Sequence, residues 1–353
     1  MTTETTLRPD QLRTFIASVL KRLDVPAEDA GIVAGCLVFA HLRGFDTHGL
    51  PCLAGYVECL EQGRIKARPD LRIERPMPWT VRVDADNGLG QIAAYRAMQL
   101  AVEAAGTLGV GAAAIRRSNH FGAASCYSTL ALPKDCIGIV TSNAAAAAAP
   151  FGALEQLLGT NPLSVAVPTL NAPPFVIDMA TTEGSRKKVR QALQRGVPLP
   201  AGWAVDRDGN PTTDPLAALD GVMLPFGGMK GSAVTLLLDI LAGVLTGAEF
   251  GGRVLSVLTN QERESGNGNF MLVLKVDSFL PAAEFKARMD EELARVRALK
   301  PVKGIKEVIY PGYKEHFAEA ARREQGIPLP AAVVEEARQF GERHGVAFPM
   351  TTE

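Results

Sequence analysis

His48 is one of only five histidines in the 353 residues, and it stands in the glycine-flanked segment RGFDTHGL. The hydroxyl of Thr47 precedes it, the carboxylate of Asp46 lies one residue earlier and Gly49 follows. An imidazole exchanges a proton near neutral pH, so His48 in such a loop could act as a general acid or base. A purely structural histidine is the alternative that the sequence leaves open.

A second histidine, His120, and one carboxylate, Asp178, also stand at positions that could serve chemistry. His120 lies in SNHFG, after the β-like run GVGAAAI and before a predicted helix. Asp178 ends the apolar run of VIDMATT, where it is either a helix cap or a site residue. Ligands gather at the carboxyl ends of strands in α/β proteins, so both residues are candidates for one site.

Two glycine-rich segments could hold a phosphate group. NGLGQIAA (87–94) fits the Rossmann fingerprint in outline, but no strand ends in an acidic residue about twenty positions later. We therefore interpret this segment as a turn that begins a helix. LPFGGMKG (224–231) opens a long apolar helix, and its bare N–H groups beside Lys230 suit an anion such as a pyrophosphate. A tight turn accounts for the second segment equally well.

Several other classes of protein are disfavoured. The sequence has no HExxH, HxH or GxSxG motif, so neither a metal site nor a serine hydrolase is expected. A net charge of −1, from 37 basic and 38 acidic residues, predicts no nucleic-acid or membrane partner. The five cysteines form no CxxC pair and the amino terminus lacks a signal pattern. These features predict a cytoplasmic protein.

The elements around these motifs predict an α/β protein. The first 75 residues have helical spacing of apolar residues. From Thr80 onward, short β-like runs alternate with alanine-rich helices, and 229–245 has the pattern of a buried helix. From Gly312 the chain is again helical and charged. We expect an α/β core flanked by helices from both chain ends.

In their order along the chain, these segments resemble the type-2 malate/lactate dehydrogenase family. That family includes ureidoglycolate, sulfolactate and diketogulonate oxidoreductases and the piperideine/pyrroline-2-carboxylate reductases. The resemblance extends from about residue 10 to about residue 325. It rests on RGFDTHGL, DNGLGQIAA, SNHFGAA, GTNPLSVAVP, IDMATT, GWAVDRDGNPTTDP, LPFGGMKGSA and LAGVLTG.

The resemblance implies a fold and a set of boundaries. The nicotinamide-cofactor domain would be non-Rossmann and built on a largely antiparallel sheet, with a helical domain formed from both chain ends. Residues 1–75 would carry the histidine loop and pack with 312–353, and 76–311 would bind the cofactor, with 125–197 as a sub-domain. Members of the family are homodimers or larger, with the cleft near the subunit interface.

The resemblance also implies roles for individual residues. His48 would exchange the proton with the substrate while Thr47 orients its ring, and His120 would be catalytic or contact the cofactor. Thr160 would lie on the substrate side. The cofactor, NAD or NADP, would contact His120, Phe121, Gly122, Ser142, Asp178, Met179, Ala180, Lys230, Gly231, Pro311 and Gly312.

Two positions bear on the substrate. Cys52 stands where relatives commonly carry an arginine for the substrate carboxylate, and a thiol cannot replace that bidentate partner. Lys188 stands where the imine-reducing members have an aspartate, and a cation there could stabilise an oxyanion. We therefore expect reduction of a small 2-oxo acid or a derivative. A cyclic imine reductase and a non-catalytic nucleotide- or metabolite-binding protein are the alternatives.

Overall fold

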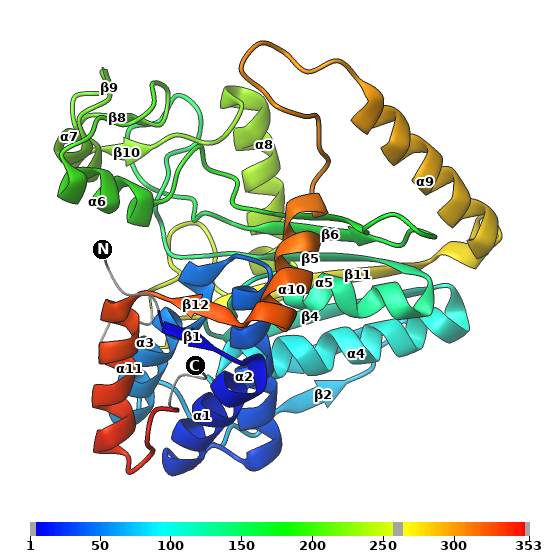
Figure 1. Ribbon diagram of the computed structural model, residues 1–353, viewed down its shortest axis with the longest axis horizontal. Coiled ribbons are helices and arrows are strands. Elements are labelled where there is room, and N and C mark those ends of the chain that lie inside the picture. Colours follow the sequence, from blue (N-terminus) through cyan, green and yellow to red (C-terminus); the bar gives the residue numbers. More distant parts are fainter. Residues whose placement is uncertain (1–4, 257–263, 350–353) are drawn as a thin grey trace.

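The computed structural model describes residues 5–256 and 264–349, and a seven-stranded sheet forms its centre (Figure 1). The strand order is β2-β3-β4-β11-β5-β6-β7, and every neighbouring pair is antiparallel except β3 and β4. The mixed α/β fold with a mostly antiparallel sheet is as predicted. The strands are β2 (Arg72–Glu74), β3 (Thr80–Asp84), β4 (Val110–Ser118), β5 (Cys136–Ser142), β6 (Leu163–Val167), β7 (Phe175–Met179) and β11 (Asn267–Lys275).

Small side chains let a long helix lie close against this sheet. Helix α4 (Gly90–Leu108) follows β3 and runs along one face of the sheet, in cyan in Figure 1. A Cβ atom on Gly111 of β4 would lie 1.9 Å from the carbonyl oxygen of Ala101, so only glycine fits at this crossing. The alanine-rich runs of the sequence are therefore the contact surface between the helix and the strands.

The two ends of the chain pack together. Strand β1 (Thr5–Leu7) pairs antiparallel with β12 (Ile327–Leu329), and a shared core joins Leu12 and Leu53 to Phe340. Figure 1 shows the first and last helices side by side. The division into domains at 75 and 311 stays a prediction. The terminal helical elements are α1 (Pro9–Arg22), α2 (Ala27–Leu42), η1 (Asp46–His48), α3 (Leu50–Glu61), α10 (Tyr313–Gln325) and α11 (Ala331–Arg343).

A smaller unit lies beyond the β7 edge of the sheet. Its three strands have the order β10-β8-β9, and a small core joins Ala148 and Val189 to Met223. The sub-domain limits 125–197 stay a prediction. The elements of this unit are α6 (Arg186–Arg195), β8 (Ala204–Val205), β9 (Pro211–Thr212), α7 (Pro215–Asp220) and β10 (Val222–Met223). Between β4 and β5 of the large sheet lie α5 (Ser125–Ser128) and η2 (Thr129–Lys134).

The helix predicted to be buried at 229–245 is exposed along one side. It consists of α8 (Gly228–Asp239) and a π-helical turn, η3 (Ile240–Val244), and only one face packs inside the chain. Leu237 is 51% exposed and Leu245 60% exposed, so the prediction of burial is wrong for the single chain. The reason is that this helix has apolar side chains on all its faces, while the sheet can cover only one of them.

The last elements before the C-terminal helices are η4 (Val276–Ser278) and α9 (Ala282–Ala298). Helix α9 extends away from the sheet in Figure 1 and carries the charged surface that the sequence predicts. In the ranges 5–256 and 264–349, no helix combines the length and the apolar character that a membrane span needs.

Candidate active site

The two candidate histidines lie face to face. His48 ends the short helix η1 and His120 follows strand β4, and their ring centroids are 6.0 Å apart with an interplanar angle of 18°. Both rings line a cavity of about 180 Å³ at the edge of the sheet. Most of the predicted site residues line it as well, namely Phe121, Gly122, Ser142, Thr160, Asp178, Met179 and Ala180.

Buried polar contacts hold the loop that carries His48. Nδ1 of the buried His41 lies 2.9 Å from an Asp46 carboxylate oxygen, and the Leu50 amide donates to His41 Nε2 at 2.8 Å. Arg322 of α10 donates two hydrogen bonds to the same carboxylate. Burial alone would raise the pKa of Asp46, but the hydrogen bonds from His41 and Arg322 outweigh it and lower the pKa to about 2. Residues from both ends of the chain thus fix this loop.

The immediate surroundings of His48 restrict its ring. Thr47 Oγ1 lies 3.2 Å from His48 Nδ1, which supports the orienting role expected for this hydroxyl. On the other side, a Cβ atom on Gly49 would lie 2.2 Å from the His41 ring. The glycine of the THG segment is therefore required by the packing of the buried His41 ring.

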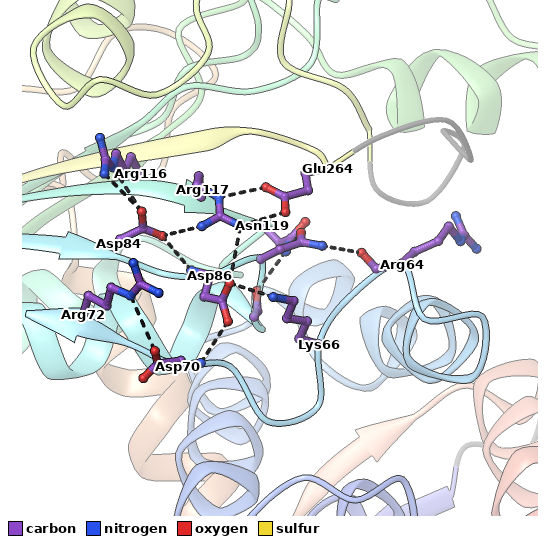
Figure 2. Close-up of polar contacts among 12 residues, drawn as sticks. Arg64, Lys66, Asp70, Arg72, Asp84, Asp86, Arg116, Arg117, Asn119 and Glu264 are labelled. Carbon is purple, nitrogen blue, oxygen red and sulfur yellow. Dashed lines mark hydrogen bonds and ion pairs between the residues drawn. The ribbon is translucent and has the colours of Figure 1, made fainter.

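An irregularity in strand β4 directs the segment that carries His120. Arg117 has a positive φ of 50°, and the pairing of β4 with β11 shifts register opposite Asn267 and Asn269. A left-handed arginine is costly, on the order of 1–3 kcal/mol, unless its surroundings hold it. Figure 2 shows how the guanidinium is held, by Glu264 at 2.9 and 3.0 Å, Asp84 at 3.1 Å and Asp86 at 3.3 Å. The ion network stabilises the bend that leads to His120.

The glycine-rich segment at 87–91 packs directly beneath this bend. The Asn119 side chain donates to Asn87 Oδ1 and to the Gly88 carbonyl, both at 2.9 Å. A Cβ atom on Gly90 would lie 2.2 Å from the Asn119 carbonyl oxygen. Both contacts lie within the chain, and these features support the turn interpretation of NGLGQIAA over a phosphate loop.

Two residues that the sequence did not single out, Tyr56 and Gln91, form a hydrogen-bonded line behind His120, and Tyr56 makes the contact with its ring. The Tyr56 hydroxyl lies 2.6 Å from His120 Nδ1 and accepts a hydrogen bond from Gln91 Nε2 at 2.8 Å. Burial raises the pKa of Tyr56 well above its usual range, so the phenol stays protonated. A polar residue amid the apolar start of α4, in GQIAA, is the one signal that could have identified Gln91.

His120 differs from His48 in its environment. Its ring reaches solvent through the cavity, while protein atoms enclose the other side. Desolvation and, second, the charge of His48 lower the pKa of His120 to about 4. His120 is therefore neutral near pH 7.

Asp178 forms another part of the cavity wall. It is the last residue but one of β7 and accepts hydrogen bonds from the Ser125 amide at 2.8 Å and the Ser125 hydroxyl at 2.5 Å. Burial raises the pKa of Asp178, and the two hydrogen bonds oppose that shift. Asp178 thus accepts from the first amide of the short helix α5 and also lines the cavity, and its role as a site residue stays a prediction.

A larger cavity of about 1110 Å³ adjoins the same two histidines. Thr47 and Cys52 line it from the N-terminal helices, and the Cys52 thiol donates to the Thr47 carbonyl at 3.3 Å. Four glutamates contribute to its wall. Among the described residues that line this cavity, Arg343 of α11 is the only arginine or lysine.

Five predicted site residues lie outside both cavities. Lys188 is exposed on α6, with its ammonium 5.9 Å from the centre of the Trp203 ring. Lys230 is exposed on α8, whose preceding Gly227 amide donates to Glu183 at 2.9 Å. The remaining three are in tight backbone packing, Gly231 against Phe226 and the Pro311–Gly312 turn against strand β7.

A group of three or more histidine, cysteine, aspartate or glutamate side chains suited to a metal ion does not occur within 5–256 and 264–349. All five cysteines are free thiols.

A comparison with protein families identifies the chain. The model of the malate/L-lactate dehydrogenase family matches residues 7–338. The chain belongs to the malate/L-lactate dehydrogenase family. The match spans the N-terminal helices, the central sheet and the start of α11, and it ends before Arg343.

Individual relatives of this chain agree with it in length and fold. The L-sulfolactate dehydrogenase of Methanocaldococcus jannaschii is 40% identical over 318 residues, which cover 90% of this chain and 91% of the relative. Its solved structure matches with a TM-score of 0.91, at 38% identity, and covers 97% of this chain and 98% of that one. The ureidoglycolate dehydrogenase (NAD(+)) of Escherichia coli is 32% identical over 320 residues, 91% of each chain.

A third relative has a different reaction in its name. The solved Δ1-piperideine-2-carboxylate reductase of Pseudomonas syringae matches with a TM-score of 0.85 at 29% identity, and covers 95% of this chain and 99% of that one. The same fold in this family therefore includes proteins named for oxidising an alcohol and proteins named for reducing an imine.

The smaller cavity combines apolar and polar lining. Its volume is below the roughly 300–1,000 Å³ of pockets that hold drug-sized ligands, so it has room for part of such a molecule. Phe45 and Phe121 line it with apolar surface, and the hydroxyl of Thr160 adds a donor and an acceptor, whereas both polar atoms of the Asn143 side chain are bonded to Glu249 and Gly268. Gly122, with φ of 81°, leaves room beside them.

Proposed function

We propose that this protein is an NAD(P)-dependent oxidoreductase that interconverts a small 2-oxo acid, or a derivative, and the matching 2-hydroxy compound. The single observation that carries the proposal is the stacked pair His48 and His120 on a cavity that also contains Asp178. Alcohol–carbonyl interconversion needs one group to exchange a proton and another to stabilise the oxygen, and two imidazoles in different environments supply both.

In this proposal each wall residue has a distinct task. The nicotinamide, when bound, supplies or accepts the hydride. His48 donates the proton to the carbonyl oxygen in reduction and removes it from the hydroxyl in oxidation, with Thr47 orienting its ring. His120, being neutral, offers a hydrogen bond to the substrate oxygen or the cofactor carboxamide. The rings of His48 and His120 form part of the cavity wall and so limit access of water to the reacting carbon.

The cofactor would contact several residues of the smaller cavity. Asp178, Met179 and Ala180 form one side, and Phe121, Gly122 and Ser142 form the other. Lys230 and Gly231 at the start of α8, and the Pro311–Gly312 turn behind β7, would serve the remote part of the dinucleotide. The names of relatives support a nicotinamide coenzyme and leave the choice between NAD and NADP open.

The anchor for the substrate anion would be Arg343. A 2-oxo acid carries a carboxylate, and Cys52 offers it no positive charge. Arg343 lines the cavity that holds His48 and Cys52, and no described carboxylate pairs with it. A single guanidinium opposite the histidines favours substrates with one carboxylate beside the carbonyl, and the glutamates of the same wall disfavour a second anionic group.

A cyclic imine reductase is the second candidate function, and the likeness to the piperideine-carboxylate reductase is the observation that favours it. Lys188 lies outside both cavities, beside Trp203, so its charge does not decide between carbonyl and imine chemistry. A non-catalytic nucleotide-binding protein is the third candidate function. The presence of both His48 and His120 disfavours it.

One assay separates the three candidates. Absorbance of the reduced nicotinamide would be followed with NADH and with NADPH against a panel of 2-oxo acids, their amides and cyclic imines. We expect turnover with monocarboxylic 2-oxo acids. Turnover confined to cyclic imines would establish the second function. Nucleotide binding without turnover of any compound would establish the third.

We also propose that the protein acts as a homodimer or larger homo-oligomer. The exposed face of α8 and η3 carries Leu236, Leu237, Ile240, Val244 and Leu245. A continuous apolar face of this kind usually marks an interface. Sedimentation velocity at micromolar concentration would show the oligomer, and a monomer at that concentration would contradict it.

A further inference from the structure

The hydroxyl of Tyr56 lies between a buried amide and the ring of His120. It lies 2.8 Å from Gln91 Nε2 and 2.6 Å from His120 Nδ1. Tyr56 is 1% exposed and Gln91 is fully buried, so water does not compete for the contact between these two side chains. Three side chains from three elements, α3, α4 and the end of β4, thus form one hydrogen-bonded line that ends at a ring of the proposed active site.

The donors and acceptors along this line determine where the protons lie. The amide NH₂ of Gln91 can only donate, so the Tyr56 oxygen accepts. The single proton of the phenol then points to His120 Nδ1, which must accept it and therefore carries no hydrogen. In the neutral ring the remaining proton is on Nε2.

Exchanging the positions of Nε2 and Oε1 in Gln91 would reverse the direction of hydrogen-bond donation from Gln91 to Tyr56 and His120. It would also leave the NH₂ group, in place of the carbonyl oxygen, without a partner. As oriented, Gln91 Oε1 is buried without a partner. A reversed amide would bury the NH₂ group in that place instead, and buried donors without partners are rarer than buried carbonyl oxygens without partners. The orientation with Nε2 facing Tyr56 is therefore the favoured one.

We infer that Tyr56 and Gln91 are positioning residues that hold His120 as a neutral imidazole with its proton on Nε2. His120 then presents a fixed donor to the cavity, and His48 is left to exchange the proton. The charged and titratable groups around His120 are His48 at 6.0 Å, Tyr56 behind the ring and Asp178 across the cavity. A second cation beside His48 would oppose its protonation, and the line of hydrogen bonds prevents it.

The segment NGLGQ gains a function from this arrangement. Gly90 permits the close approach of the Asn119 backbone, and the next residue, Gln91, reaches the Tyr56 hydroxyl. The glycines that resemble a dinucleotide fingerprint thus help to position Gln91, which donates to Tyr56, and Tyr56 in turn contacts His120.

The tautomer can be tested directly on the wild-type protein. With ¹⁵N-labelled histidine, two-bond ¹H–¹⁵N spectra distinguish Nδ1–H from Nε2–H rings, and the His120→Asn variant assigns the signal. We expect the Nε2–H pattern for His120 and no protonation between pH 5 and 8. An Nδ1–H pattern would overturn the inference. This readout needs no turnover, so it is independent of the proposed function.

Variants then test the consequence, which rests on the proposed function. Tyr56→Phe and Gln91→Leu should reduce kcat on the order of 10- to 100-fold through misplacement of His120, with little change in nucleotide affinity. Tyr56→Phe should also raise the lower apparent pKa of the kcat profile and mix the two tautomers. The control is Tyr310→Phe, which removes another buried phenol that donates to a backbone carbonyl, that of Pro173. An unchanged pH profile and tautomer in folded Tyr56→Phe would refute the positioning role.

Discussion

The two walls of the larger cavity are held in different ways. On the histidine wall, His48 and His120 are fixed from behind by buried partners, among them His41, Tyr56 and Gln91. On the opposite wall, Arg343 is exposed and has no described ion pair. The acid–base geometry is thus determined by several contacts for each ring, whereas the anion contact depends on one exposed side chain.

This difference indicates how the fold could serve several substrates. A proton donor must be placed to within a fraction of an ångström, so a single substitution among the residues that hold the histidines should disturb it. A carboxylate anchor must only reach the substrate with the right charge, so it can move from one element to another. We therefore expect substitutions on the histidine wall to affect kcat and those on the arginine wall to affect KM and substrate preference.

The largest effect should come from His48→Ala. Loss of the proton donor should lower kcat on the order of 10²–10⁴-fold while the nucleotide still binds, because general acid–base catalysis is typically worth that much. Steady-state kinetics and nicotinamide fluorescence titration measure the two quantities. His316→Ala, at an exposed position on α10, is the control. A kcat within about threefold of wild type in folded His48→Ala would remove His48 from the mechanism.

Arg343→Gln should have a smaller effect, and on a different constant. Loss of one charge-assisted anchor should raise KM for a 2-oxo acid about tenfold, equivalent to roughly 1.4 kcal/mol, with a smaller change in kcat. Arg338→Gln, an exposed arginine on the same helix that does not line the cavity, is the matched control. Equal KM values in Arg343→Gln and wild type would show that the anchor lies elsewhere.

Cys52→Arg should sharpen the comparison in the other direction. An arginine on α3, in the wall shared with His48, should improve kcat/KM for free 2-oxo acids over the matching amides by up to about tenfold. It should also restore the KM of Arg343→Gln in the double variant. Cys52→Ser keeps the size and a donor for the Thr47 carbonyl and serves as control. Impaired use of the free acid by Cys52→Arg would instead mean that the wild-type anchor already fills this space.

The smallest effect should appear in stability at low pH. The folded-state pKa of Asp46 is about 2, below its usual value near 3.8, so this carboxylate stabilises the fold above pH 4 and the contribution is lost as the pH falls toward 2. Asp46→Asn should therefore be less stable than wild type at pH 7, with the difference narrowing below pH 4. Denaturant unfolding at several pH values measures this. The exposed Asp208→Asn should show no such convergence.

Much of the fold and part of the site could be predicted from the sequence. Alternating β-like runs and alanine-rich helices have strong local patterns, and the glycines beside His48 and His120 mark the turns that carry both rings. Residues 229–245 were wrongly predicted to be buried in this chain. Apolar character indicates a surface that favours packing, but it does not indicate whether the packing partner belongs to the same chain.

Tyr56 and Gln91 could not be predicted because their roles arise from contacts between distant segments. Each belongs to an ordinary helix pattern, and only the packing of Gly90 against Asn119 brings them to His120. Arg343 was missed for the same reason, since it lies 295 positions after His48 and a charged residue near a helix end usually faces solvent. The site residues taken from the family resemblance stay predictions until the variants are measured.

The pairing of β1 with β12 has a consequence for folding during synthesis on the ribosome. The loop that carries His48 is made within the first fifty residues of the sequence, whereas Arg322 and α11, which contribute to its surroundings, follow the strands of the central sheet. The sheet can therefore form before the helical part, which needs α10 and α11 to leave the exit tunnel. Under the proposed function, a nascent chain has both histidines before the larger cavity around them is complete.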